Sequence, residues 1–133
     1  MKGTYLLILK NLKPLKLKIG KLREIYFNKK FYIYVGSALN NLEKRIKRHL
    51  LKNKKLHWHI DYLTTNENFK IIRVYYKTSA RKEECFFANK LSNYFKSIKG
   101  FGSTDCKCKS HLFETDLQEF NFIKDMGFKI FDK

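Results

Sequence analysis

The sequence is short of acidic residues. It contains 12 Asp and Glu against 29 Lys and Arg, which gives a formal net charge of +17. A large excess of one sign destabilises a compact chain by self-repulsion unless a polyanion neutralises it. We therefore expect an anionic partner. Nucleic acid is favoured, with DNA first and RNA as the alternative.

Long apolar runs are also missing. The longest, Tyr5–Leu9 and Phe31–Val35, are too short to cross a bilayer. The chain passes from Met1 into a strand-like run without the apolar segment and small-residue cleavage site of a secretory signal. These absences favour a cytoplasmic protein that has no membrane partner.

Cysteine is scarce, and its count of three is odd. Cys106 and Cys108 are separated by one residue, too close for an unstrained disulfide between them. With Cys85 and His111 they supply enough ligands for a structural zinc ion, although the spacing is not a standard zinc-finger pattern. Packing by reduced cysteines is the favoured interpretation, and zinc stays open as the alternative.

Repeats and low-complexity linkers are absent as well. With 133 residues, 44% of them hydrophobic, the chain is long enough for one compact domain and too short for two. We expect a single domain over residues 1–133, with a core over about 1–115 and a C-terminal extension over about 116–133.

Hydrophobic periodicity predicts both strands and helices. Short apolar or β-branched runs predict strands over residues 4–9, 31–36 and 70–77, with 31–36 central in the sheet and a hairpin over 16–27. Leu42, Ile46 and Leu50 recur every four residues after an Asn40-Asn41 cap, as in an amphipathic helix. Further helices are expected over residues 57–65 and 81–96, the latter ended by Gly100 and Gly102. A last short helix or strand is expected within 113–131. The predicted class is α+β with α/β-like features, a small central mixed sheet flanked by helices.

Two short motifs mark the predicted central strands. Gly3-Thr4-Tyr5 opens the first strand, and Tyr34-Val35-Gly36 closes the central one. Arg45 follows nine residues later, His49 comes one helical turn after it, and Glu84 opens a later helix. In this order the residues resemble the motifs of the GIY-YIG nuclease superfamily.

The resemblance extends over about residues 1–115. The segments YVGSALNNLEKRIKRHL, LHWHIDYL, Glu84-Cys85 and GFGSTDCKCKSHLF are similar to an uncharacterised archaeal branch of that superfamily. Some members of that branch are fused to an endonuclease III-like repair enzyme, so a repair enzyme is an expected partner. Tyr5 and Tyr34 are 29 positions apart, longer than is usual in the superfamily, which indicates an inserted hairpin.

The resemblance implies a nuclease that hydrolyses phosphodiester bonds with one divalent metal, Mg²⁺ or Mn²⁺. The implied catalytic residues are Tyr5, Tyr34, Arg45, His49 and Glu84. The tyrosines would position or deprotonate the attacking water, which at a pKa near ~10 requires nearby cations. Arg45 would clamp phosphate, His49 would hydrogen-bond or shuttle a proton, and Glu84 would bind the metal through hard oxygen donors.

Other residues are expected to contact nucleic acid. They are Gly36, Ser37, Lys44, Lys47, Arg48, His57 and His59. Gly36 would let backbone or substrate approach closely. Glu84 could instead form a buried salt bridge to a lysine, and His57 and Asp61 could lock a helix. The alternative functions are an inactive nucleic-acid-binding module and a basic accessory protein of a repair or RNA-processing assembly. Convergence of the implied catalytic residues on one cleft would favour the enzyme.

Overall fold

The computed structural model describes residues 1–132 and contains a six-stranded sheet with the strand order β6-β7-β4-β1-β5-β8. Its strands are β1 (Gly3–Asn11), β4 (Phe31–Ala38), β5 (Phe69–Thr78), β6 (Lys96–Ser97), β7 (Leu112–Thr115) and β8 (Lys129–Ile130). A separate two-stranded sheet is formed by β2 (Leu15–Ile19) and β3 (Arg23–Phe27). The helices are α1 (Leu42–His49), α2 (Asp61–Thr64), α3 (Glu84–Ser92) and α4 (Phe122–Asp125). None of the helices in residues 1–132 is long and apolar enough to cross a membrane.

Strand β1 lies inside the sheet between β4 and β5, and it is antiparallel to both. β4 and β5 therefore run in the same direction, and the connection between them carries α1 and α2. The α+β class is confirmed. The sequence predicts a mixed sheet, but every strand pair within residues 1–132 is antiparallel, because β1 separates the two parallel strands.

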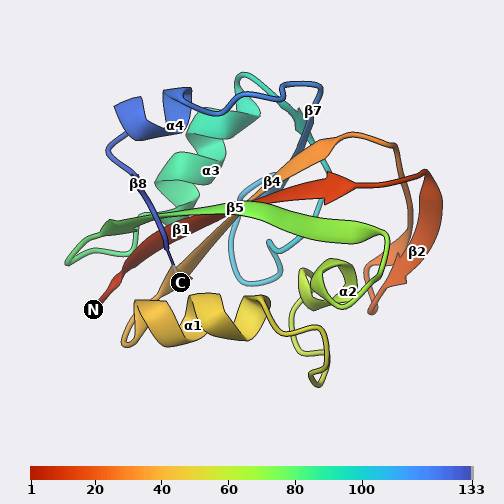
Figure 1. Cartoon of the computed structure of the whole chain (residues 1–133), viewed down its shortest axis with the longest axis horizontal. Helices are drawn as coiled ribbons and strands as arrows, with labels where there is room; N and C mark the ends of the chain where they lie inside the picture. Colours follow the sequence, from red (N-terminus) through yellow and green to blue (C-terminus); the bar gives the residue numbers. More distant parts are fainter. Residues whose placement is uncertain (133) are drawn as a thin grey trace.

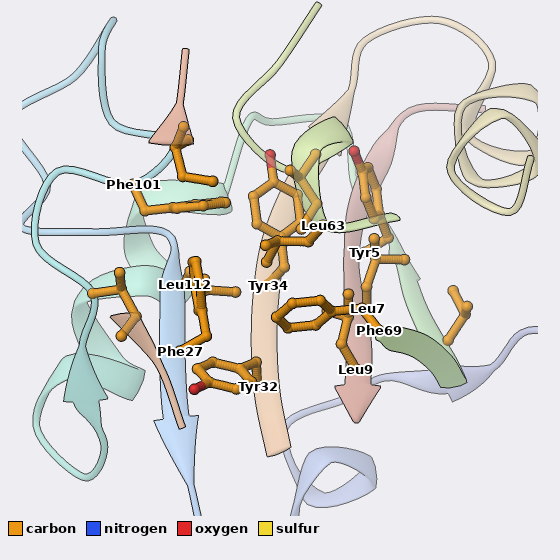
Figure 2. Close-up of a cluster of buried hydrophobic side chains, with 14 of the residues drawn as sticks. Tyr5, Leu7, Leu9, Phe27, Tyr32, Tyr34, Leu63, Phe69, Phe101 and Leu112 are labelled. Atoms are coloured by element: carbon orange, nitrogen blue, oxygen red, sulfur yellow. The ribbon is translucent and has the colours of Figure 1, made fainter. Parts of the chain in front are cut away.

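Helices cover both faces of the sheet, with α1 and α2 on one side and α3 and α4 on the other (Figure 1). Successive side chains of a strand point to opposite faces. Tyr5, Leu7 and Leu9 accordingly pack on the α1–α2 face (Figure 2), whereas Leu6 and Ile8 pack on the opposite face. Burial on both faces explains why β1 is a continuous apolar run rather than an alternating one.

The predicted hairpin and first helix are confirmed. Ile19 and Phe27 of the β2–β3 hairpin are fully buried in the cluster on the α1–α2 face. The Asn41 side chain accepts the backbone N–H of Lys44 at 3.0 Å, the N-cap that the sequence predicts. At the other end of α1 the Lys54 ammonium donates to two main-chain carbonyls, those of residues 48 and 49. A cation there satisfies acceptors that a helix terminus leaves unpaired.

Two predicted helices are shorter than expected. The helix expected over residues 81–96 ends at Ser92, well before Gly100, because Lys96 and Ser97 pair with β7 as strand β6. The helix expected over residues 57–65 is reduced to α2, preceded by a turn. The segment over 113–131 contains both kinds of element, since β7, α4 and β8 all lie partly or wholly within it. Pairing with β7 overrides local helix preference at the C-terminal boundary of α3.

Candidate active site

An open cleft of about 640 Å³ lies beside β1 and β4, between α1, the start of α3 and the loop before β7. Four of the five implied catalytic residues line it, namely Tyr5, Tyr34, Arg45 and Glu84. Its other lining residues are Gly36, Ser37, Ala38, Leu39, Asn40, Asn41, Trp58, Lys82, Cys85, Gly102, Asp105, Cys106 and His111. The fifth implied catalytic residue, His49, is buried and is connected to the cleft by its hydrogen bond to Tyr5.

Strand register brings the two tyrosines together. Tyr5 lies opposite Gly36, and Tyr34 is two residues before Gly36 on the same face of β4. The ring centroids are 6.5 Å apart, and Figure 2 shows both hydroxyl groups at the same end. A Cβ at Gly36 would lie 2.4 Å from the Tyr5 ring, so glycine is needed for this ring to cross β4. Gly36 was expected to allow close approach of backbone or substrate, but Tyr5 itself fills this space.

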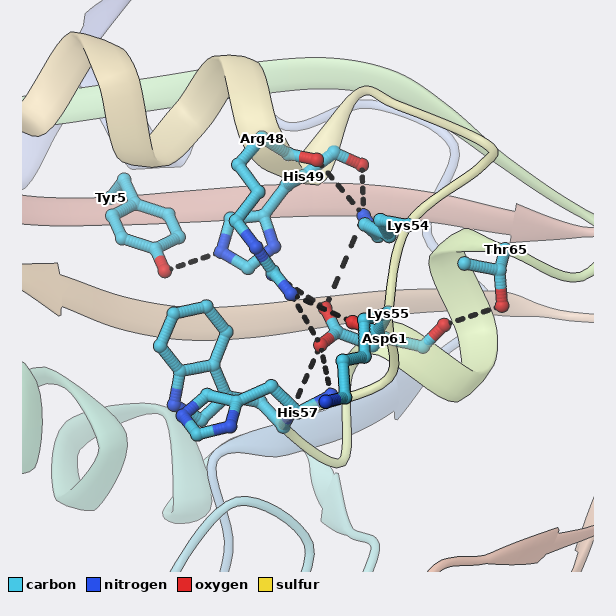
Figure 3. A network of polar contacts seen from close by, with 9 residues as sticks. Tyr5, Arg48, His49, Lys54, Lys55, His57, Asp61 and Thr65 are labelled. Atoms are coloured by element: carbon cyan, nitrogen blue, oxygen red, sulfur yellow. Dashed lines mark hydrogen bonds and ion pairs between the residues drawn. The ribbon is translucent and has the colours of Figure 1, made fainter.

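The Tyr5 hydroxyl lies 2.6 Å from Nε2 of His49 (Figure 3). Burial lowers the pKa of His49 to about 3, with the positive charge of Lys54 acting in the same direction. The imidazole is therefore neutral, and its Nδ1 has no hydrogen-bond partner within the described chain. Burial also raises the pKa of both Tyr5 and Tyr34 above the ordinary value, although the charge of Arg45 opposes the shift. Both tyrosines thus hold their protons at neutral pH.

Arg45 presents an uncommitted guanidinium to the cleft. Its Nη1 donates to the carbonyl of Ser37 at 3.0 Å, and the group lies 4.6 Å from the centroid of the Trp58 ring. No carboxylate among residues 1–132 forms an ion pair with it. Its remaining donors are free for the forked hydrogen bonding that suits phosphate. Sequence reasoning did not single out Trp58 as a residue of this site.

Arg48 is committed elsewhere. Its two terminal nitrogens donate to the buried carboxylate of Asp61 at 3.0 and 3.1 Å. Its guanidinium also lies over the Trp58 ring, 4.6 Å from the ring centroid. Asp61 also accepts the backbone N–H groups of His57 and Trp58. Arg48 is therefore held in place by Asp61, and its expected phosphate contact stays a prediction. The expected contact between His57 and Asp61 is made by the main chain of His57.

The Asp61 carboxylate is strongly held in its charged form. Burial alone would raise its pKa, but the hydrogen bonds from Arg48 and from two backbone N–H groups outweigh burial and lower it. The Lys54 ammonium, 4.0 Å away, adds a second positive charge. This network fixes the turn that carries Trp58 and so sets the wall of the cleft next to Arg45.

Glu84 faces the cleft from the first turn of α3. Its carboxylate lies 3.2 Å from Nζ of Lys82 and 3.6 Å from Nδ1 of His111. Glu83 turns away and pairs with Lys77 at 3.1 Å, so the two adjacent carboxylates occupy different faces. The ion pair with Lys82 is the alternative role that the sequence left open for Glu84. Lys82 itself was missed, because nothing distinguishes it in a lysine-rich chain.

The donor set at this point of the cleft fits a magnesium ion. Mg²⁺ prefers hard oxygen ligands and commonly takes one or two carboxylates, with water and phosphate completing its shell. Glu84 offers one carboxylate to the cleft, and Asp105 is an exposed acidic residue that lines the same cleft. Sequence reasoning did not identify Asp105.

The remaining predicted nucleic-acid contacts differ in accessibility. Ser37 lines the cleft, and Lys44 and Lys47 are exposed on α1, where Lys47 pairs with Glu43 at 3.3 Å. The exposed His57 ring packs against Trp58, with centroids 4.8 Å apart. His59 accepts the backbone N–H of Gly102, so it holds the loop before β7 instead of offering a free ring nitrogen on Nδ1. His59 is thus a positioning residue of the cleft wall.

The structure also brings together the four residues for which zinc stayed open. The ligand atoms of Cys85, Cys106, Cys108 and His111 all lie within 4.8 Å of one another. All three cysteines are free thiols. Cys85 comes from α3, whereas the others come from the loop before β7, so only the tertiary fold reveals the group.

Comparison with protein families gives one match. Residues 4–129 match the family described as "Domain of unknown function DUF123". The chain belongs to this family. The DUF123 match spans every residue placed in or behind the cleft, from Tyr5 to His111. No curated protein and no solved structure matches the sequence significantly.

Proposed function

We propose that this DUF123 protein is a metal-dependent endonuclease of the GIY-YIG type that hydrolyses phosphodiester bonds in DNA during repair or nucleic-acid processing. The convergence of Tyr5, Tyr34, Arg45 and Glu84 on one cleft, with Tyr5 bonded to His49, carries the proposal. These residues come from two strands and two helices, and packing alone does not require their polar groups to meet. The net charge of +17 suits a polyanionic substrate.

Substrate phosphate binds next to Arg45 and Lys82. The Arg45 guanidinium is held by Ser37 and Trp58, so its orientation is set before substrate arrives. Preorganised donors of this kind stabilise charge that develops on phosphoryl oxygens in the transition state. Glu84 would hold the divalent metal, and the metal would supply stabilisation of charge on the phosphoryl and leaving oxygens. Lys82, which pairs with Glu84 at 3.2 Å, would be a second cation for the phosphate.

The two tyrosines position the attacking water. The Tyr34 hydroxyl has no hydrogen-bond partner within residues 1–132 and lines the cleft, so it can bind water directly. In the tautomer of neutral His49 that carries its proton on Nδ1, the Tyr5 hydroxyl donates to Nε2, which leaves the Tyr5 oxygen able to accept a hydrogen bond. A negatively charged phosphate in the cleft favours the protonated form of His49. The water proton can thus pass to Tyr5 as the Tyr5 proton passes to His49.

A nucleic-acid-binding module without catalysis is the second candidate. The ion pair between Glu84 and Lys82 favours it, because Lys82 neutralises a carboxylate that would otherwise repel phosphate. Both candidates predict salt-dependent binding, with log affinity falling linearly as log salt rises. Only the nuclease predicts cleavage that needs a divalent metal.

The test is cleavage of labelled duplex, branched and single-stranded DNA and RNA with Mg²⁺, Mn²⁺ or chelator. Glu84→Gln removes the charge that holds the metal, and Tyr34→Phe removes one hydroxyl at the water. Each should lower the cleavage rate by on the order of 10² or more, while binding measured by fluorescence anisotropy stays nearly unchanged.

Glu83→Gln is the matched control, because Glu83 is the adjacent carboxylate but lies outside the cleft. It should cleave like the parent protein. Salt-sensitive binding of every substrate without metal-dependent cleavage of any would establish the binding module instead. An inactive Glu83→Gln variant beside an active Glu84→Gln variant would contradict the role of Glu84.

A further inference from the structure

We propose that Cys85, Cys106, Cys108 and His111 bind one structural zinc ion. This proposal is independent of the nuclease proposal, because it concerns different ligands and a different metal. Thiolate sulfur selects soft or borderline metals such as zinc, whereas Mg²⁺ requires oxygen. Three cysteines and one histidine form one of the common ligand sets of structural zinc sites.

The spacing of the ligand atoms is close to a zinc tetrahedron. With zinc–sulfur bonds of about 2.3 Å, the edges of the tetrahedron are about 3.8 Å long. The four ligand atoms all lie within 4.8 Å of one another, about 1 Å above this edge length, so one ion could reach all four after small side-chain shifts. The His111 side chain is 2% exposed and Nε2 lies 3.2 Å from Sγ of Cys106, which places the imidazole inside the group.

The second nitrogen of His111 explains which tautomer is present. Nδ1 lies 3.2 Å from the main-chain carbonyl of Val35, an acceptor that requires a proton on Nδ1. Nε2 then carries the lone pair and faces the cysteines. Glu84 lies 3.6 Å from the same Nδ1. Histidine ligands of zinc usually donate their other N–H to a carbonyl or carboxylate, and His111 has one of each in reach.

A bound metal ion would stabilise the loop segment that carries Cys106 and Cys108. No residue from 102 to 109 is buried, and Lys107 and Lys109 flank Cys108. Ordering a polar loop costs conformational entropy that apolar burial does not offset here. A zinc ion would join this loop to the first turn of α3 through Cys85.

The proposed zinc site adjoins the cleft, because three of its ligands, Cys85, Cys106 and His111, line the cleft. The zinc ion would hold His111 against Glu84 and so fix the position of the carboxylate. Four protein ligands leave no open position for water, as is typical of structural and not of catalytic zinc sites. The zinc ion is therefore a separate metal from the one proposed at Glu84.

Elemental analysis of the purified full chain tests the site. The parent protein should contain about one zinc per chain. Cys106→Ser and Cys108→Ser should each lose most of it, and chelation should lower the melting temperature of the parent by roughly 5 °C or more. The matched control is Lys107→Ser, which changes the exposed residue between the two ligands and should keep both zinc and melting temperature.

Cobalt substitution keeps the proposal testable if the cysteine variants do not fold. Parent protein refolded with Co²⁺ should show the intense visible bands of tetrahedral Co²⁺ and the near-ultraviolet charge-transfer band of cobalt–thiolate bonds. Zinc should abolish both. Parent protein that is folded with far less than one zinc, that shows no thiolate bands with Co²⁺, or whose thiol titration reveals a disulfide would overturn the proposal. None of these readouts depends on nuclease activity.

Discussion

Two buried polar clusters lie beside each other under α1, and they differ in how completely they are satisfied (Figure 3). In the Asp61 cluster, formed by Arg48, Lys54 and Asp61, the carboxylate accepts four hydrogen bonds. In the tyrosine–histidine cluster, formed by Tyr5, Tyr34 and His49, one bond joins Tyr5 to His49. Nδ1 of His49 has no partner within residues 1–132, and Tyr34 lines the open cleft.

This difference distinguishes polar residues that stabilise the fold from polar residues that are available to a substrate. A buried group whose bonds are all made within the protein has nothing left to offer a substrate, and breaking its bonds costs stability. A group left with unused donors or acceptors at a cleft can bind water or phosphate. Sequence alone does not distinguish the two clusters, since Arg45 and Arg48 both lie in the same basic run.

The largest effect on stability is expected from Asp61→Ala. The substitution leaves Arg48 and Lys54 without their counter-charge and two backbone N–H groups without their acceptor. Removing one partner of a buried ion pair typically costs about 3–5 kcal/mol. Urea denaturation should show a loss of this size in the free energy of unfolding.

The control for Asp61 is Glu43→Ala, which breaks the exposed pair with Lys47 on the outer side of the same helix. Exposed pairs contribute less than about 1 kcal/mol. Equal losses for Asp61→Ala and Glu43→Ala would show that the Asp61 cluster is not the structural one.

A smaller effect is expected from pH, through His49. The unfolded histidine takes up a proton near its ordinary pKa of 6.5, whereas the folded one does so only at about 3. The unfolded state therefore binds more protons between these values, and stability falls as the pH drops below 6.5. Between pH 6.5 and 5 the loss from this residue is about 1–2 kcal/mol.

Urea denaturation at a series of pH values measures this slope. His49→Gln should flatten most of it, and His57→Gln, which changes an exposed ring nearby, should not. The lowered pKa of Asp61 acts only below the ordinary carboxylate range, so it leaves this window unaffected. If His49→Gln has the same dependence of unfolding free energy on pH as the parent protein, a group other than His49 takes up the proton.

The smallest effect is expected from Tyr34→Phe. Phenylalanine keeps the ring that packs against Phe101 and His49, and the lost hydroxyl had no partner to leave unsatisfied. The free energy of unfolding should change by no more than about 0.5 kcal/mol. Thermal and urea unfolding of the variant, measured together with its cleavage activity, test this expectation. A loss above about 2 kcal/mol would mean that the hydroxyl is structural, like Asp61.

Much of the fold follows from local patterns. The run around Tyr5 and the run around Tyr34 are strongly strand-like, and the four-residue spacing of Leu42 and Ile46 marks α1. Boundaries that depend on distant pairing do not follow. Residues 93–97 continue a helical pattern, yet Lys96 and Ser97 pair with Glu114 and Phe113 of β7, a contact that local sequence does not encode.

The candidate site divides in the same way. Ordered motifs identified four of the residues that line the cleft, Tyr5, Tyr34, Arg45 and Glu84. Trp58 and Asp105 lie in segments that the resemblance singled out, but no pattern marks either as a cleft residue, and Lys82 is one lysine among many. Only the tertiary structure shows that Arg48 pairs with Asp61 and that the Tyr5 ring packs against Gly36.

The place of β1 between β4 and β5 bears on the order in which the chain folds. The earliest strand of the sequence is an interior strand, so its second neighbour becomes available only when residues 69–78 have been synthesised. Contacts of such wide sequence separation slow folding, because loop-closure entropy must be overcome first. The last residue of the cleft lining to be synthesised is His111. A nascent chain at the ribosome therefore carries both tyrosines long before it has a site in which they can act.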